Sequence, residues 1–171
     1  MIQKPKTYPS LAVANFFVQQ SLKTGASLTP MKLLKLVYIA HGWSLALFDT
    51  PLISEIVQAW EYGPVIPEVY YAFRHYRAGQ ITDMKHETAG NRIVTPTVEP
   101  DDRSAEALLE KVWAGYGKED ALYLSTITHQ PGTPWSQAWE TQGKNAIISQ
   151  DSIKSHYKHL ADARRVVREP A

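Results

Sequence analysis

His129 is the residue whose setting most suggests chemistry, because it ends a predicted helix just before the Pro-Gly turn of THQPGTPW. As a general base it would need a nucleophile and an orienting carboxylate beside it, and the spacing identifies neither. Its imidazolium would instead interact favourably with the carbonyl end of the helix. We therefore expect His129 to cap this helix. Membership of a binding surface, together with Thr128 and Trp135, is the alternative role.

The other histidines predict neither a metal site nor a cofactor. His156 and His159 stand three residues apart on the predicted last helix, among four Lys and Arg side chains that would oppose a bound cation. His41 falls on an apolar helix face, where we expect a buried, hydrogen-bonded imidazole. The chain has no cysteine, no Gly-rich phosphate loop, no Gly-x-Ser-x-Gly elbow and no His-Glu-x-x-His. We predict a protein that is not an enzyme.

An exposed aromatic and basic face is predicted on the segment PEVYYAFRHYRA, residues 67–78. Helical spacing turns four apolar side chains toward the core: Val69, Tyr70, Phe73 and Tyr76. The outward set is then Tyr71, Arg74, His75 and Arg77. Tyrosine with arginine is the composition of a protein-contact hot spot, and it also suits stacking and phosphate contacts with RNA. A solvated face carrying one amphipathic tyrosine is the third interpretation.

These side chains are carried by a mainly α fold. Apolar periodicity and capping residues predict helices at 11–24, 31–48, 67–78, 103–117, 121–129, 134–140 and 151–165, capped among others by Ser10, Thr29, Asp120 and Asp151. Residues 53–62 alternate like a strand, and 92–98 is the one plausible second strand, which could pair with 55–62. We predict a single helical domain of about six helices with a small two-stranded β element.

The segment AWEYGPVIP, residues 59–67, predicts a rigid strand-to-helix corner. Gly63 is free to take a positive φ, and Pro64 and Pro67 each fix φ near about −65°. Ile66 is biased to an extended conformation by the proline that follows it.

The length and net charge of the chain limit the number of domains and the kinds of partner that we expect. The 171 residues suit one domain, with a core at about 10–160 and tails at 1–9 and 165–171. The net charge of +1, from 18 Lys and Arg against 17 Asp and Glu, gives no long-range attraction for a polyanion, so we do not expect a nucleic-acid partner. No signal peptide or membrane-length apolar run is evident, which predicts a cytoplasmic protein with no membrane partner.

Two segments resemble the signature blocks of the Panacea domain, also called the SocA-like antitoxin domain. The first, residues 28–73, has its Lys-Leu-x-Tyr helix, its Gly-Trp pair and its Ala-Trp-x-x-Gly-Pro-Val corner, and the second, LSTITHQPGTPW, has its Leu-Ser-x-x-Thr-His and Pro-Trp. The resemblance spans residues 10–160, approximately, and implies a mainly helical fold. It implies that the shared scaffold includes Lys35, Tyr38, Gly42, Trp43, Ala59, Trp60, Gly63, Pro64, Val65, Thr128, His129, Pro134 and Trp135.

The resemblance implies binding in place of catalysis. Members of this family typically neutralise a toxin encoded beside them by direct contact, some can deliver the toxin to a protease, and some are only phage-associated. The leading prediction is therefore an antitoxin of a type II toxin–antitoxin system, with a cognate toxin as partner and no cofactor. Its candidate contact residues are Tyr71, Arg74, His75, Arg77, His129 and Trp135. A proteolytic adaptor, using VVREPA as a contact tail, is the alternative, and a small nucleic-acid-binding regulator is the alternative of another class.

Overall fold

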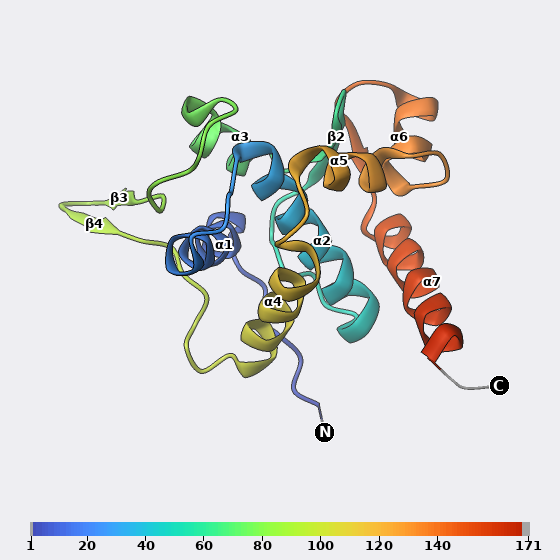
Figure 1. Cartoon of the computed structure of the whole chain (residues 1–171), viewed down its shortest axis with the longest axis horizontal. Helices are drawn as coiled ribbons and strands as arrows, with labels where there is room; N and C mark the ends of the chain where they lie inside the picture. Colours follow the sequence, from blue (N-terminus) through green and yellow to red (C-terminus); the bar gives the residue numbers. More distant parts are fainter. Residues whose placement is uncertain (1, 169–171) are drawn as a thin grey trace.

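The helix α2, Pro30–Phe48, forms the centre of the fold in this computed structural model, which describes residues 2–168. Every side chain from Lys32 to Leu45 is buried. Four helices pack around α2 (Figure 1): α1 (Ser10–Thr24), α4 (Arg103–Tyr116), α5 (Ala121–His129) and α7 (Gln150–Arg168). Within the described residues, α2 is the one helix long and apolar enough to cross a membrane, and 78% of its apolar window is buried in the protein. Its apolar surface is used to build the core.

The remaining helices are short: α3 (Pro67–Phe73), the 3-10 turn η1 (Arg74–Tyr76) and α6 (Pro134–Gln142). The predicted mainly α fold is confirmed, with seven α-helices within the described residues. The prediction of one continuous helix over 67–78 was wrong. The α-helix ends at Phe73, whose φ of −118° departs from the helical value, and the chain tightens into η1. The turn η1 then ends at Arg77, where φ is 55°.

The predicted helix starts are confirmed at α2, α4, α5 and α6. Each is capped by a side-chain oxygen that accepts a hydrogen bond from an amide of the first turn. The capping residues are Thr29, Asp102, Asp120 and Thr133, and Pro30 and Pro134 occupy the first helical position of α2 and α6.

Two caps differ from the prediction. Ser10 is the first residue of α1 instead of its cap, and its amide donates to both carboxylate oxygens of Glu55, at 3.0 and 2.8 Å. At α7, Ser149 takes the place expected for Asp151, since its hydroxyl accepts from the Ser152 amide at 3.1 Å. In the first case the cap comes from a residue 45 positions away, which local sequence does not reveal.

The β structure is larger than predicted and paired differently. β1 (Val57–Trp60) lies between β2 (Gly63–Val65) and β5 (Ala146–Ile148) in an antiparallel sheet. The predicted second strand pairs elsewhere, as the hairpin of β3 (Glu87–Ala89) with β4 (Arg92–Val94), which projects from the body of the molecule (Figure 1). Its turn is Gly90-Asn91, a two-residue connection that favours a local partner over a distant one.

The N-terminal segment is bound to the body of the protein, although we predicted a tail over residues 1–9. Tyr8 is buried, its amide donates to the Leu52 carbonyl at 2.8 Å and its hydroxyl donates to Asp102 at 2.7 Å. At the other end, α7 continues to Arg168, so the predicted tail over 165–171 begins as helix. The last three residues of VVREPA lie outside the described residues.

Candidate partner-binding site

The hairpin of β1 and β2 is held by a buried lysine of the central helix. Lys35 is 1% exposed, and its ammonium donates to the Pro64 carbonyl at 3.0 Å. No carboxylate among the described residues pairs with it, and burial lowers the pKa of Lys35 to about 7. Gly63 has the positive φ that we expected, 116°, and a Cβ atom there would lie 3.0 Å from the Lys35 nitrogen. The predicted strand-to-helix corner is instead the second strand of this hairpin, followed by α3.

Two more helices donate to the same hairpin. The Ser125 hydroxyl of α5 donates to the Tyr62 carbonyl at 2.6 Å. The Trp135 indole of α6 donates to the Trp60 carbonyl at 2.7 Å. With Lys35 on Pro64, the alternate carbonyls of residues 60, 62 and 64 each receive a side-chain donor from a different helix. We call this set the hairpin cluster: Lys35, Trp60, Tyr62, Gly63, Pro64, Ser125, Thr128, His129 and Trp135.

Thr128 and His129 complete the α5 side of the hairpin cluster. The buried Thr128 hydroxyl contacts the carbonyls of Leu124 and Ser125 at 2.8 and 3.0 Å. The His129 Nδ1 atom contacts the Ser125 carbonyl, one turn back along α5. The partner is a helix carbonyl, as we expected, but it lies before the last four carbonyls, which a C-terminal cap would bind. Its ring also lies edge-on to Trp135, with centroids 5.2 Å apart.

Ser125 and His129 are close but are not arranged as a nucleophile and its base. The Ser125 oxygen lies 3.3 Å from His129 Nδ1, yet Ser125 is 3% exposed and its hydroxyl already donates to the Tyr62 carbonyl. His129 Nδ1 faces the Ser125 carbonyl, so in this geometry that nitrogen donates a proton and does not accept one. Ser125 is thereby used to position the hairpin, and His129 contacts the Ser125 carbonyl. Ser125 stands in the Leu-Ser-x-x-Thr-His block but was not predicted as a scaffold or contact residue, because its role depends on a carbonyl 63 residues away.

The remaining scaffold residues join α2 to α7. A Cβ atom at Gly42 would lie 2.3 Å from the ring of Tyr157, so this glycine permits the close approach of the two helices. Tyr38 and Trp43 pack edge-on against the same ring, at centroid distances of 6.1 and 5.2 Å. Tyr38 is 1% exposed, and its hydroxyl has no hydrogen-bond partner among the described residues. Pro134 is buried at the start of α6.

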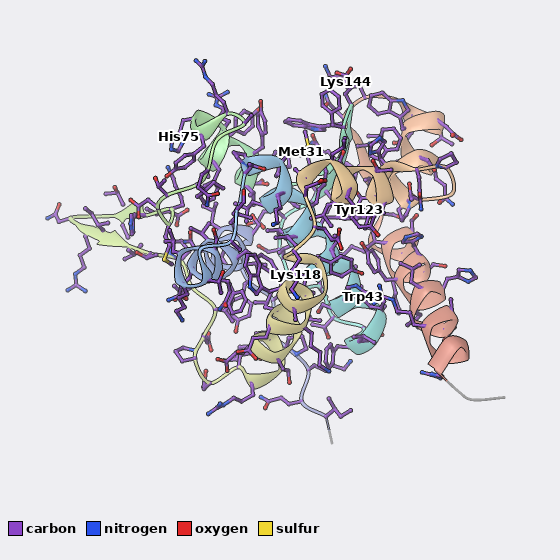
Figure 2. All side chains as sticks on the ribbon, viewed as in Figure 1. Met31, Trp43, His75, Lys118, Tyr123 and Lys144 are labelled. Carbon is purple, nitrogen blue, oxygen red and sulfur yellow. The ribbon has the colours of Figure 1, made fainter. Side chains whose placement is uncertain are left out.

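The predicted contact face forms a patch at the end of α3. Tyr71, Arg74, His75 and Arg77 are all exposed, and the surroundings of His75 can be followed in Figure 2. The Arg74 guanidinium lies over the Tyr71 ring, 5.1 Å from its centroid, and neither Arg74 nor Arg77 forms an ion pair with a described residue. We call these four residues the α3 patch.

His129 and Trp135 belong to the hairpin cluster and are half-buried there, apart from the α3 patch. Aromatic contacts connect the two regions: Tyr70 lies 4.8 Å from Trp60 and 5.3 Å from Tyr71, measured between ring centroids. Tyr62, at the tip of the hairpin, is 61% exposed and was not predicted as a contact residue. Its position in a two-residue turn was the available signal. No group of three potential metal ligands occurs among the described residues.

The sequence of the chain matches a known protein family. A family model described as "Antitoxin SocA-like, Panacea domain" matches residues 33–136, a range that contains the whole hairpin cluster and the α3 patch. The chain is also similar to a protein named Antitoxin SocA from Caulobacter vibrioides (strain NA1000 / CB15N). The two are 28% identical over 148 residues, which cover 85% of this chain and 78% of that protein. No solved structure gives a significant match.

Proposed function

The chain belongs to the Panacea domain family of SocA-like antitoxins, and from this we propose that it neutralises a cognate toxin by direct contact. The membership supports an antitoxin role and, with it, a toxin partner. We further propose that this role is non-enzymatic, needs no cofactor and is carried out in the cytoplasm. Masking a toxin requires a specific interface and no reacting group, and interfaces draw most of their energy from a few buried aromatic and arginine side chains.

The α3 patch is the observation that supports direct contact. The motif residues of the hairpin cluster form hydrogen bonds mainly with one another. The side chains of the α3 patch are exposed instead: Tyr71, Arg74, His75 and Arg77. Tyrosine and arginine are enriched at protein-contact hot spots. Because the Arg74 guanidinium already lies over the Tyr71 ring, less side-chain freedom is lost when a partner binds. Tyr62 extends this exposed aromatic surface toward the hairpin tip.

Co-expression with the neighbouring open reading frame tests the proposal. The neighbour should stop growth when expressed alone and be tolerated when this chain is expressed with it. The two purified proteins should then form a complex. A neighbour that is harmless alone, or a toxic neighbour that this chain neither rescues nor binds, contradicts the proposal.

The toxin half-life separates masking from delivery to a protease. A masking antitoxin leaves the half-life unchanged or lengthens it, whereas a proteolytic adaptor shortens it. Toxin loss that disappears in a host lacking its ATP-dependent proteases would favour the adaptor. A toxin that persists while growth is restored would favour masking.

A further inference from the structure

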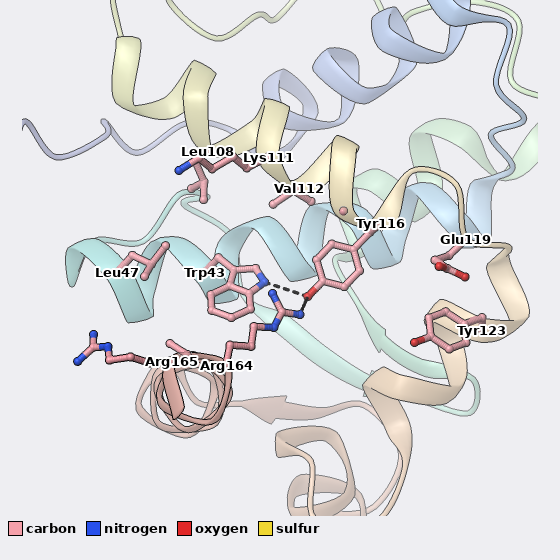
Figure 3. A pocket seen from close by; sticks show the side chains of 12 residues that line it. Trp43, Leu47, Leu108, Lys111, Val112, Tyr116, Glu119, Tyr123, Arg164 and Arg165 are labelled. Carbon is pink, nitrogen blue, oxygen red and sulfur yellow. Dashed lines mark hydrogen bonds between the residues drawn. The ribbon is translucent and has the colours of Figure 1, made fainter. Parts of the chain in front are cut away.

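A groove of about 770 Å³ lies between α4 and α7, with the end of α2 as its floor (Figure 3). Its apolar lining comes from all three helices: Leu47, Leu108, Val112 and Ala161. Its charged lining is Lys111, Glu119, Arg164 and Arg165. We call it the Arg164 groove. It stands apart from the hairpin cluster and the α3 patch, and its α7 wall lies outside the residues matched by the family model.

Trp43, Tyr116 and Arg164 form a connected trio in this groove. The Tyr116 hydroxyl oxygen accepts two hydrogen bonds, from the Trp43 indole at 3.2 Å and from the Arg164 guanidinium at 2.9 Å. The guanidinium also lies 4.8 Å from the centroid of the Trp43 ring, which holds it in a defined place (Figure 3). Two contacts, one with the Tyr116 hydroxyl and one with the Trp43 ring, therefore hold Arg164 before any partner binds.

The trio presents donors and no matching acceptor. Because the Tyr116 oxygen accepts both bonds, its own proton is free to be donated, and no described residue accepts it. Arg164 has five N–H donors and uses them in one hydrogen bond among the described residues. A group that is acceptor-only and planar, such as a carboxylate, satisfies the tyrosine proton and the guanidinium fork together.

The charged side chains around the trio are mostly positive. Lys111, Arg164 and Arg165 line the groove against a single carboxylate, Glu119, and none of the three cations forms an ion pair with a described residue. The three cations are exposed, while Leu108 and Val112 at the base of the groove are buried. The complementary occupant is acidic and carries apolar side chains.

We propose that the Arg164 groove binds an acidic, apolar-anchored segment of the partner toxin. One carboxylate of the segment lies on Arg164 and Tyr116, and an apolar side chain packs against Leu108 and Val112. A groove of about 770 Å³ is the size of a small-ligand site and holds a few side chains of one segment. The identity of the partner rests on the proposed antitoxin function. The chemistry of the groove does not.

A nucleic acid is the less suitable occupant, although a phosphate could also meet Arg164. The face of Trp43 is covered by the guanidinium, so it cannot act as a stacking platform for a base. The net charge of +1 also provides no general attraction for a polyanion.

The first experiment measures toxin binding by titration calorimetry with charge-reversed variants. Arg164→Glu and Arg165→Glu should each weaken the complex, with Arg164→Glu losing about 30-fold or more, because its carboxylate partner would be left unpaired. Lys158→Glu makes the same change on an exposed residue of α7 that does not line the groove, and its affinity should stay within about threefold. Far-ultraviolet circular dichroism confirms that each variant folds. Arg164→Glu and Arg165→Glu both binding like the wild type overturns the proposal while leaving the antitoxin function intact.

The second experiment needs no toxin. A phage library of random 12-residue peptides is selected on the wild-type protein after depletion on Arg164→Glu. Enriched peptides should carry at least one Asp or Glu within about four residues of an apolar residue, and should lose binding when that acid becomes Asn or Gln. No enrichment over the variant, enrichment of peptides without acids, or selective binding of a single-stranded oligonucleotide overturns the groove assignment. If the toxin test fails but this selection succeeds, the antitoxin function is wrong and the groove chemistry stands.

Discussion

The ammonium nitrogen of Lys35 lies 3.0 Å from the position that a Cβ atom on Gly63 would occupy. The lysine therefore reaches the Pro64 carbonyl across a residue that has no side chain. The two signature blocks of the family meet at this point, because Thr128 of α5 approaches the same Gly63 position at 3.5 Å. This close approach of the lysine to the backbone requires a residue without a side chain at position 63.

Substitution of Gly63 tests this contact. Gly63→Ala and Gly63→Val should destabilise the protein by about 3 kcal/mol or more, since each adds backbone strain at a φ of 116° and displaces Lys35. Gly25→Ala is the matched control, because Gly25 also has a positive φ, 73°, but no atom of the described residues lies within 4 Å of an added Cβ. It should cost only about 1–2 kcal/mol. Urea unfolding measures both, and equal losses would show that the lysine contact contributes nothing.

Gly42 and Gly115 make a second matched pair, since both lie inside helices. Gly42→Ala places a methyl group 2.3 Å from the buried ring of Tyr157, so it should cost about 3 kcal/mol and loosen α7 from α2. Gly115→Ala meets no atom within 4 Å in the part of the chain that the structure describes, and should stabilise the protein by about 0.5–1 kcal/mol. Thermal unfolding compares them. A tolerated Gly42→Ala would mean that α7 packs differently from the structure.

Lys35 predicts a rise of stability with pH. Burial lowers its pKa to about 7, below its usual value of 10.5, so between these pH values the unfolded chain binds more protons than the folded one. Stability from this group should increase by about 2 kcal/mol from pH 7 to pH 9. Lys35→Met, which carries no proton, should lack the increase. The midpoints of urea unfolding at pH 7 and pH 9 measure this increase in the wild type and in Lys35→Met. An equal increase in the two proteins would contradict a buried Lys35.

Local patterns explain which parts of the fold were predictable. Thr29-Pro30 caps α2 through contacts within four residues, and the apolar run that follows continues for five turns. The partners of β1 could not be recognised in the same way. β2 and β5 have three residues each, and β5 lies more than 80 residues further along the chain. A strand of that length shows almost no alternation, so its pairing depends on tertiary packing.

The functional surfaces also contain features that could be predicted from the sequence and features that could not. Helical spacing correctly separated the outward Tyr71 and Arg74 from the buried Phe73, because that information is periodic. The break of α3 into η1 and the exposure of Tyr62 depend on the turn geometry at single residues. In the Arg164 groove, Tyr116 lies 48 residues from Arg164 and 73 residues from Trp43, so the donor trio exists only after the three helices pack.

His41 predicts a loss of stability in mild acid. The expected buried histidine is confirmed: it is 1% exposed, and its Nδ1 atom accepts from the amides of Leu52 and Ile53, at 3.3 and 3.4 Å. Burial lowers the pKa of His41 to about 4, so as the pH falls below 6.5 the unfolded state gains a proton that the folded state refuses. About 3 kcal/mol should be lost between pH 6.5 and pH 4. His41→Asn should be less stable at pH 7.5 but lose less on acidification, and a parallel decline in both proteins would contradict the assignment.

Arg74 is the decisive residue of the α3 patch. Its side chain is exposed and its described contact is the Tyr71 ring, so Arg74→Glu should leave the free energy of unfolding within about 0.5 kcal/mol of the wild type. The same change should weaken toxin binding by about tenfold or more, because it removes a hot-spot arginine and introduces a repulsive charge. Arg103→Glu, on the exposed start of α4, is the control with an equal change of charge and should bind normally. Calorimetric titration with the toxin measures all three proteins. Normal binding by Arg74→Glu would show that the toxin contacts another face, and a loss limited to Arg164→Glu would identify the groove as that face.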